Sequence, residues 1–325
     1  MAAEAEMVAV RERATRRRAS GGAGDAAFHG LTIFFATLVL MILGGVIVSL
    51  IYGAWPALRK FGLGFIVNGA WNPVTENFGA LAPIYGTIVT SLIAMLIGIP
   101  VAFGVALFIT ELCPKWLKRP LGTMIELLAA IPSIIYGIWG LFVLAPAIQE
   151  YIEPALIDTL GEIPGFGILF AGPPLGIGVL TAGFILAIMV LPFIASVMRD
   201  VFETVPPMLK ESAYGLGATT TEVVTRVVLP YARVGVIGGV LLGLGRALGE
   251  TMAVTFVIGN SHHVNASILQ PGTTISAALA NEFTEAVGDM YQASLIALGF
   301  ILFIITFFVL AAAKLMLLRL QKNAG

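Results

Sequence analysis

Six long runs of apolar residues, separated by polar segments, dominate the chain. They lie near residues 30–52, 84–110, 124–148, 175–198, 234–258 and 291–313. Each is long enough for an α-helix to cross about 30 Å of hydrocarbon, which takes roughly 20 residues. The pattern therefore predicts an all-α membrane protein with six transmembrane helices. An even number of spans places both termini on the same side of the membrane.

Composition supports a membrane location independently of the runs. Hydrophobic residues make up 58% of the 325 residues and charged residues only 11%, whereas about a quarter of the residues of an average soluble domain are charged. Such a chain cannot have water as its main solvent. The net charge of -1 gives no orientation, because the distribution of cations among the loops decides that.

The positions of the basic residues predict the orientation. All 18 Lys and Arg residues except Arg59, Lys60 and Arg246 fall in alternate segments, which include both termini. Since cytoplasmic loops collect Lys and Arg, we expect both termini to be cytoplasmic. The cations on this side are Arg11, Arg13, Arg16, Arg17, Arg18, Lys115, Lys118, Arg119, Arg199, Lys210, Arg226, Arg233, Lys314, Arg319 and Lys322.

The N-terminal region predicts a basic tail followed by an uncleaved helix. The apolar run from Leu31 to Ile51 exceeds the roughly 7–15 residues of a signal peptide. The polar, Arg- and Gly-rich residues 1–29 are predicted to form a disordered cytoplasmic tail. Residues 314–325 form the second cytoplasmic tail.

Residue patterns for metal or nucleotide chemistry are weak. The single Cys113 allows no internal disulfide, and the adjacent His262 and His263 are interpreted as a solvated pair in an external loop. The sequence has no phosphate loop of the G-x-x-x-x-G-K-[ST] type, so this chain cannot hydrolyse ATP by that route. We predict no metal, no cofactor, no catalytic residue and no nucleic-acid partner.

The glycines of the fifth run favour close helix packing. Small residues four apart let transmembrane helices approach each other. The set is Gly235, Gly238, Gly239, Gly243 and Gly245.

Two charged residues inside the fifth run are the clearest chemical signal. Arg246 and Glu250 are four residues apart, so on a continuous helix they would share a face and could pair. Arg246 lies about 12 residues into the run, or roughly 18 Å at ~1.5 Å per residue, which is close to mid-membrane. A guanidinium there costs at least about 2.5–3.5 kcal/mol and suggests a substrate pathway.

The chemistry of the pair fits a protonated oxyanion such as hydrogen phosphate. The guanidinium can donate several hydrogen bonds, whereas Glu250 would repel an anion that has no proton to donate. The alternative is a structural ion pair that neutralises itself or fastens the helix to a neighbour.

A polar island within residues 200–233 carries a spaced motif. Glu211-Ser212-Ala213 and Gly217 are followed by Val227 and then by Leu229-Pro230. This spacing resembles the EAA loop of bacterial ABC importer permeases, with Ser212 for Ala and Val227 for Ile as departures. The resemblance implies a short cytoplasmic helix that docks in a groove of a separate ATPase. The coupling residues it implies are Glu211, Ser212, Ala213, Gly217, Leu229 and Pro230.

Three further blocks narrow the resemblance to permeases of high-affinity phosphate ABC importers. They are Trp71-Asn72-Pro73, the segment 126–137 and the segment 245–254. The resemblance implies a type I (MetI-like) permease fold in which a core of five helices is joined by one N-terminal helix. In this layout residues 30–52 are the extra helix, 53–83 a periplasmic segment and 84–313 the permease domain.

The resemblance also implies the partners. One chain would form half of the pathway in the bacterial inner membrane. It would work with a second, homologous permease (PstA-like), an ATPase dimer (PstB-like) and a periplasmic phosphate-binding protein (PstS-like). ATP binding and hydrolysis would drive alternating access, and the external segments near 53–83, 149–174 and 259–290 are candidates to meet the binding protein.

Two other functions remain open on the sequence. A related ABC importer for another oxyanion, such as sulfate, would keep the Glu211 loop but would not need Arg246 and Glu250. A secondary transporter would carry its own coupling-ion site, often with inverted repeats.

Overall fold

The computed structural model describes residues 2–322, with side chains from residue 24 to residue 319. The chain divides after Gly53 into two compact units. Six helical stretches of the described residues are long and apolar enough to cross a membrane, which confirms the predicted fold class and number of spans. They are Gly24–Phe61, Leu81–Leu112, Ser133–Leu160, Val179–Glu203, Thr220–Leu248 and Asp289–Arg319.

The first unit belongs to helix α1 (Ala2–Phe61), which is longer at both ends than the predicted span 30–52. The structure is helical through residues for which the sequence predicted a disordered tail. Ala, Glu and Arg, which are frequent there, are among the strongest helix formers. The tail arginines precede the residues whose side chains are described, so their place on the cytoplasmic side stays a prediction.

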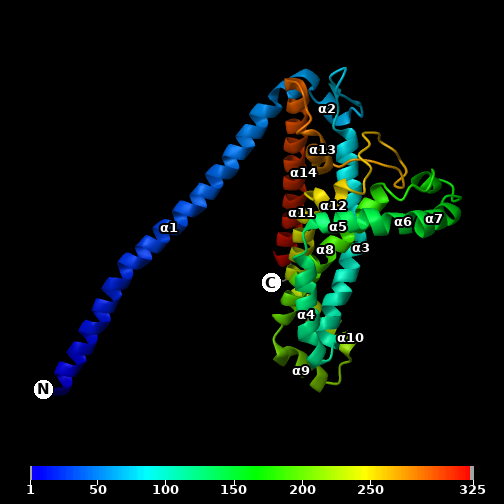
Figure 1. The fold of residues 1–325 in the computed structure, drawn as a ribbon. Helices are drawn as coiled ribbons and strands as arrows, with labels where there is room; N and C mark the ends of the chain where they lie inside the picture. The colour runs from blue at the N-terminus through cyan, green and yellow to red at the C-terminus, as the bar shows by residue number, and fades with distance from the viewer. Residues whose placement is uncertain (1, 323–325) are drawn as a thin grey trace. The chain divides into compact units, whose positions relative to one another are not determined.

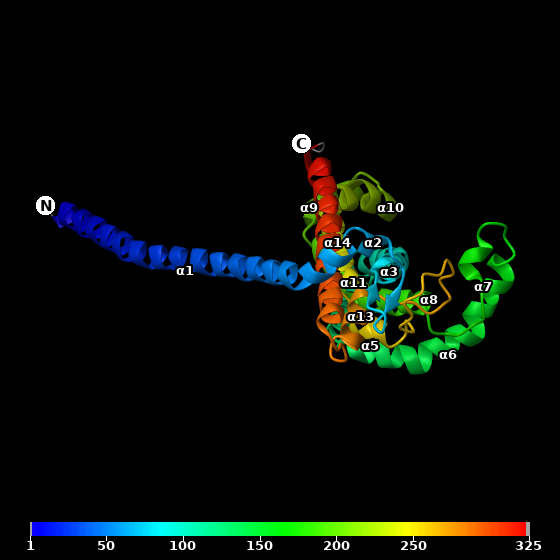
Figure 2. The same ribbon diagram turned by 90° about the horizontal axis from the view of Figure 1, so that it is seen from above.

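Helix α8 (Val179–Glu203) lies at the centre of the second unit. It packs along α3 (Leu81–Leu107) and α11 (Leu229–Leu248), and α11 in turn contacts α14 (Asp289–Lys322) (Figures 1 and 2). Most of the apolar stretch of α8 is buried within this unit. A central helix that is apolar on all sides is the expected core of a helical bundle in a membrane.

Three glycines of α11 confirm the predicted close packing. A side-chain carbon at Gly235 or Gly243 would lie 2.5 Å from Val201 or Ile194 of α8. Gly239 faces the same helix, since its carbon would lie 3.1 Å from Val197. Gly245 instead faces α14, and a carbon at Gly238 would meet nothing within 4 Å. The stripe at spacing four therefore sets the α8–α11 distance, as small residues do in membranes.

Two of the predicted spans are not continuous helices. The predicted span 124–148 is divided into α4 (Lys115–Ala129) and a second stretch that begins with α5 (Ser133–Trp139). Pro132 explains this break, because proline has no N–H and disfavours a helical conformation of the preceding residue. The second stretch continues through α6 (Ala145–Ala147) and α7 (Glu153–Leu160).

The predicted span 234–258 is also divided. Helix α11 ends at Leu248 and the short α12 (Met252–Thr255) follows. Gly249 is the C-cap of α11. Glycine carries a large entropic cost inside a helix, which makes it a favourable place to stop.

The remaining elements are short. A two-stranded antiparallel sheet pairs Trp71 with Phe78 and Asn72 with Asn77. The short elements are α2 (Gly64–Val67), β1 (Trp71–Asn72), β2 (Asn77–Phe78), α9 (Pro207–Gly215), α10 (Thr220–Val223), α13 (Ile275–Glu282), the 3₁₀ turn η4 (Gly167–Phe170) and the π-helical turns η1 (Phe108–Leu112), η2 (Gly140–Leu144), η3 (Ile148–Ile152) and η5 (Val224–Val228).

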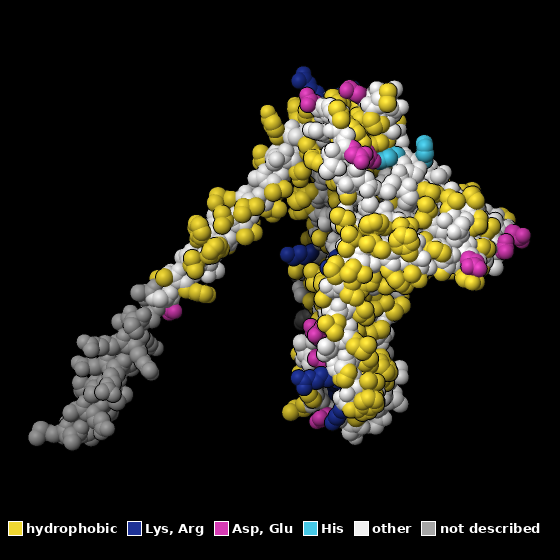
Figure 3. Space-filling model, in the orientation of Figure 1, with side chains coloured by type: hydrophobic (Ala, Val, Ile, Leu, Met, Phe, Trp, Pro, Cys, Tyr) yellow, Lys and Arg dark blue, Asp and Glu magenta, His cyan; other side chains and the backbone are white. Residues whose placement is uncertain are grey.

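The visible surface of the second unit follows the division expected of a membrane protein. Hydrophobic side chains cover most of its middle, whereas acidic and basic side chains gather mainly toward its two ends (Figure 3). A second buried cluster, which includes Phe65, Phe78 and Leu298, fixes the end that carries the small sheet.

Candidate functional site

The end of α11 presents Arg246 at an exposed position. Arg246 lies in the last helical turn, two residues before the helix ends at Leu248. Its guanidinium carbon lies 5.6 Å from the centre of the Phe193 ring, an arrangement suited to a cation–π contact. Among the residues with described side chains, none forms an ion pair with Arg246. Its donors are thus free to meet a ligand or a partner.

The predicted pairing of Arg246 with Glu250 is wrong. The break after Leu248 removes the continuous helix on which the four-residue spacing depended. Glu250 Oε1 instead accepts a hydrogen bond of 3.2 Å from the backbone N–H of Ala253. It therefore satisfies one of the free N–H groups at the start of α12. The roles of both residues in a substrate pathway stay predictions.

A second broken helix packs against this break. A side-chain carbon at Gly137 of α5 would lie 3.0 Å from the backbone oxygen of Met252 and 3.1 Å from the Cα of Ala253. Next to it, the Tyr136 hydroxyl donates a 2.8 Å hydrogen bond to the Leu128 carbonyl, which is four residues before Pro132. At each break, at least one freed backbone group thus has a hydrogen-bond partner within the chain. Backbone breaks at membrane depth are tolerated where they are buried in protein or line a cavity, and in transporters they form substrate sites.

The segment from α9 to the start of α11 contains the other predicted residues. Glu211, Ser212 and Ala213 lie on α9, as the resemblance implied for a short helix. Gly217 has a φ of +86°, a conformation that favours glycine, and its N–H donates to the Tyr214 carbonyl. Thr219 and Glu222 then form a capping box that starts α10. Leu229 and Pro230 begin α11 after the π-helical turn.

This segment is anchored on one side and exposed on the other. Lys210 Nζ and Glu111 Oε1 lie 2.5 Å apart, with side chains 19% and 6% exposed, and they join α9 to the end of the second span. Val205, Val223 and Val228 are buried in the main core. No residue of α9 is buried.

Large apolar side chains are exposed on and beside α9, and the sequence reasoning missed them. Met208 is 74% exposed and Leu216 91%, and Leu209 and Tyr214 are also exposed. Their signal in the sequence was the presence of large apolar residues inside a polar island. Exposed apolar patches rimmed by polar residues mark interaction sites.

At the end of the second unit that carries the small sheet, aromatic side chains and His262 surround Glu282. This arrangement corrects the interpretation of His262 as a solvated loop residue. Glu282 accepts hydrogen bonds from Trp71 Nε1 at 2.7 Å and from the Tyr291 hydroxyl at 2.6 Å. His262 Nε2 lies 2.5 Å from its other oxygen, and the His262 ring stacks on Trp71 at 4.8 Å. His262 is therefore a packed, paired residue, whereas His263 is exposed as predicted. Among the described residues no group of His, Cys, Asp and Glu side chains could hold a metal.

The environment of Glu282 shifts its titration. Burial favours the neutral acid, but the hydrogen bonds from His262, Tyr291 and Trp71 outweigh burial and lower the pKa of Glu282 below its ordinary value. The carboxylate thus ties together β1, the loop after α12, α13 and α14.

These features define a multi-pass membrane protein with broken spans and an exposed helical segment anchored to them. Residues 98–322 match the family described as binding-protein-dependent transport system inner membrane component. The chain therefore belongs to this family.

Relatives with high identity extend over nearly the whole chain. It is 62% identical over 301 residues to the phosphate transport system permease protein PstC of Mesorhizobium japonicum, which covers 93% of this chain and 92% of the relative. It is 55% identical over 298 residues to the protein of the same name from Pasteurella multocida, with 92% and 93% covered. A probable PstC of Methanocaldococcus jannaschii is 39% identical over 281 residues, with 85% and 87% covered.

Solved structures share the fold. A crystal structure of a bacterial alginate ABC transporter, in complex with its periplasmic protein bound to an alginate pentasaccharide, matches with a TM-score of 0.58. The match covers 89% of this chain and 95% of the other, at 18% sequence identity. The likeness is one of fold, that of an ABC importer permease.

Proposed function

We propose that this chain is the permease subunit of an ATP-driven phosphate importer and forms half of its translocation pathway. The observation that carries the proposal is the 62% identity, over nearly the full length of both chains, to a protein named as a phosphate transport permease. Arg246, which is exposed in the last turn of α11 and forms no ion pair with a described side chain, supplies a matching chemistry.

Arg246 and Glu250 are proposed to meet phosphate one after the other or together in the pathway. The guanidinium fork of Arg246 suits the oxygens of an oxyanion. Glu250 keeps one oxygen on the Ala253 N–H. Its other oxygen can accept the proton of hydrogen phosphate, a donor that sulfate lacks. Binding in this scheme stays weak enough for release, as conduction through a pathway requires.

The exposed face of the α9 segment is proposed to dock on a separate ATPase. Its apolar side chains would enter a groove, and the Lys210–Glu111 pair would pass movement of the segment to the second span. Glu211, Ser212, Ala213, Gly217, Leu229 and Pro230 are the coupling residues in this proposal. Closure of an ATPase dimer would open the permease pair outward, and hydrolysis would return it inward.

The proposed assembly contains a second homologous permease and an external phosphate-binding protein. The membrane is the bacterial inner membrane, with both termini in the cytoplasm. The segments 53–83, 149–174 and 259–290 lie on the opposite side in this topology and are the proposed contact region for the binding protein.

A complementation experiment tests the substrate. The chain is expressed in cells that lack their own high-affinity phosphate permease but keep the other subunits, and uptake of labelled phosphate is followed with and without excess sulfate. We expect uptake to be restored and to resist sulfate. Restored uptake that sulfate abolishes, or restored sulfate uptake alone, would refute the assignment to phosphate.

A further inference from the structure

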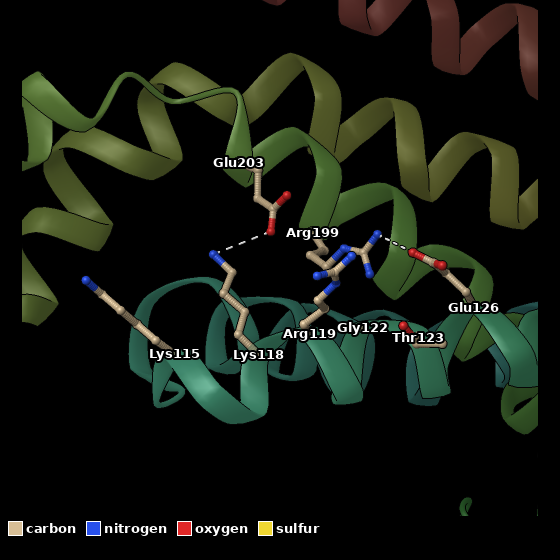
Figure 4. Close-up of a pocket in the computed structure, with 8 residues that line it drawn as sticks. All are labelled: Lys115, Lys118, Arg119, Gly122, Thr123, Glu126, Arg199 and Glu203. Atoms are coloured by element: carbon tan, nitrogen blue, oxygen red, sulfur yellow. Dashed lines mark hydrogen bonds and ion pairs between the residues drawn. The ribbon is translucent and has the colours of Figure 1, made fainter.

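A cavity of about 430 Å³ lies between α4 and α8, and Arg246 is not among the residues that line it. It is lined by four cations and two carboxylates (Figure 4). The lining residues are Lys115, Lys118, Arg119, Gly122, Thr123, Glu126, Arg199 and Glu203. The lining therefore carries more positive than negative side chains.

Arg199 is held at the wall of the cavity by acidic partners. Its Nη2 donates to Glu126 Oε1 at 2.6 Å and to Asp200 Oδ1 at 2.8 Å, and its side chain is 15% exposed. Gly122 makes room for it, because a side-chain carbon there would lie 2.6 Å from Arg199 Nη1. Within the described residues Nη1 has no hydrogen-bond acceptor. Two carboxylates thus position the guanidinium, and the Nη1 group remains as a donor without an acceptor among the described residues.

Two further cations of the cavity, Lys115 and Arg119, have no acidic partner among the described side chains, whereas Lys118 has one. Lys118 lies 3.4 Å from Glu203, but this pair is exposed and adds little. Lys115 and Arg119 form no ion pair with any described side chain. They share the cavity with Arg199, so like charges face one space. An anion between them would remove this repulsion.

The N-terminus of helix α4 also favours an anion in the cavity. Lys115 and Lys118 stand in the first turn of α4, where the helix dipole favours negative charge, and no acidic residue is present in that turn. The Thr123 hydroxyl also lines the cavity and can donate to an oxyanion. Four cations, two carboxylates and the Thr123 hydroxyl therefore line one space beside the first turn of the 15-residue helix α4.

We propose that this cavity binds a phosphate group, and the surroundings favour the headgroup of an anionic phospholipid. Trp116 is 77% exposed beside Lys115, and Leu112 before α4 and Leu127 on α4 are also exposed. Trp at a membrane interface and basic pockets between spans are the features that receive anionic headgroups. Neither Arg246 nor Glu250 lines the cavity, so the test of this site does not depend on their role.

Binding of defined phosphate compounds to the full chain in its purified assembly tests the proposal. The assembly is delipidated, and binding of phosphatidylglycerol, phosphatidylcholine and inorganic phosphate is measured by native mass spectrometry and with labelled ligand. The variant Lys115→Gln with Arg119→Gln removes the two unpaired cations. The control Lys314→Gln with Arg319→Gln removes the same two charges from exposed positions of α14.

We expect the cavity variant to bind phosphatidylglycerol at least about tenfold more weakly, while the control and phosphatidylcholine binding stay unchanged. The charge-retaining variant Lys115→Arg with Arg119→Lys should keep binding, which separates loss of charge from loss of folding. A loss confined to inorganic phosphate would support the site with free phosphate as its occupant. Equal binding by cavity variant and control, for both compounds, would overturn the proposal, whatever the outcome of the phosphate uptake test.

Discussion

At the scale of single residues, the environment of a charge decides its function more than its spacing does. Arg246 and Glu250 are four positions apart in the sequence, yet the helix ends between them and each has a different neighbour. The sequence could predict a cation and a carboxylate close to mid-membrane. It could not predict the break, because α5, which packs against α12 just after Gly249, is distant from it in the sequence. Loss of either side chain should therefore have its own effect.

Arg246→Gln should reduce phosphate uptake by roughly 10- to 100-fold, since an interaction with a charged group is worth about 1.5–3 kcal/mol. Abundance in the membrane should stay normal, because Arg246 leaves no described carboxylate without a partner. Glu250→Gln keeps an acceptor for the Ala253 N–H and should retain the fold. Uptake of labelled phosphate and membrane abundance are measured for both, with Lys314→Gln as the control. Normal uptake by Arg246→Gln would exclude a contact with substrate.

The Glu282 cluster should lose stability in acid. The pKa of Glu282 is lowered on folding, so its contribution is fully present above the ordinary carboxyl pKa of about 4.3 and is lost as pH falls through the lower folded pKa. Thermal unfolding of the purified chain is measured between pH 7 and pH 3. Glu282→Gln should be less stable than the wild type at pH 7, and the difference should shrink at the acid end. The exposed Glu285→Gln is the control, and a constant difference across this range would contradict the role of the carboxylate.

At the scale of elements, the sequence predicted which helices exist better than where they break. Apolar runs indicate spans reliably because length and hydropathy alone are needed to cross a bilayer. A break leaves the run apolar, so hydropathy alone does not show that Pro132 and Gly249 interrupt the helices of 124–148 and 234–258. The glycine stripe was predictable for the same reason as the spans. Both depend only on residues that are close in the sequence, since residues four apart lie on one face of a helix.

A larger side chain on the glycine stripe should separate α11 from α8. Gly243→Val places carbon atoms where Ile194 already lies, and overpacking of this kind costs about 1–3 kcal/mol. We expect a lower unfolding temperature in detergent and reduced membrane abundance. Gly238→Val lies on the same helix but faces open space, so it is the matched control. Equal effects of the two substitutions would show that helix propensity, and not packing on α8, is responsible.

The α9 segment should be sensitive to a charge introduced at Gly217. Its φ of +86° strains any larger residue, so Gly217→Asp is compared with Gly217→Asn, which has nearly the same shape and tolerates this conformation. We expect Gly217→Asp to weaken association with the ATPase and to reduce uptake by about tenfold relative to Gly217→Asn. Co-purification of the ATPase and labelled phosphate uptake are measured. If both variants lose ATPase association and phosphate uptake equally, backbone strain accounts for the loss. If both variants are normal, the proposed docking role of this loop is wrong.

At the scale of the whole molecule, the chain exposes what a subunit of a larger assembly needs. Arg246 is exposed at the end of α11, and the α9 segment presents apolar side chains without burying any residue of its helix. The sequence could predict these positions only through a resemblance, because a partner's surface is not encoded in the periodicity of one chain. It missed Met208 and Leu216 for that reason. Orientation in the membrane is a further property of the whole molecule, and it rests on the distribution of Lys and Arg.

The single cysteine provides a direct test of orientation. Cys113 is partly exposed between the second span and α4, directly before the basic residues Lys115, Lys118 and Arg119 of that helix. If the basic loops are cytoplasmic, a membrane-impermeant maleimide should label Cys113 in inside-out vesicles and not in intact spheroplasts. In Cys113→Ser carrying Thr75→Cys, at an exposed position of the opposite segment, the pattern should reverse. Labelling in detergent controls for accessibility of each thiol. Labelling of Cys113 in spheroplasts alone would invert the topology, and the α9 segment would then face away from any cytoplasmic ATPase.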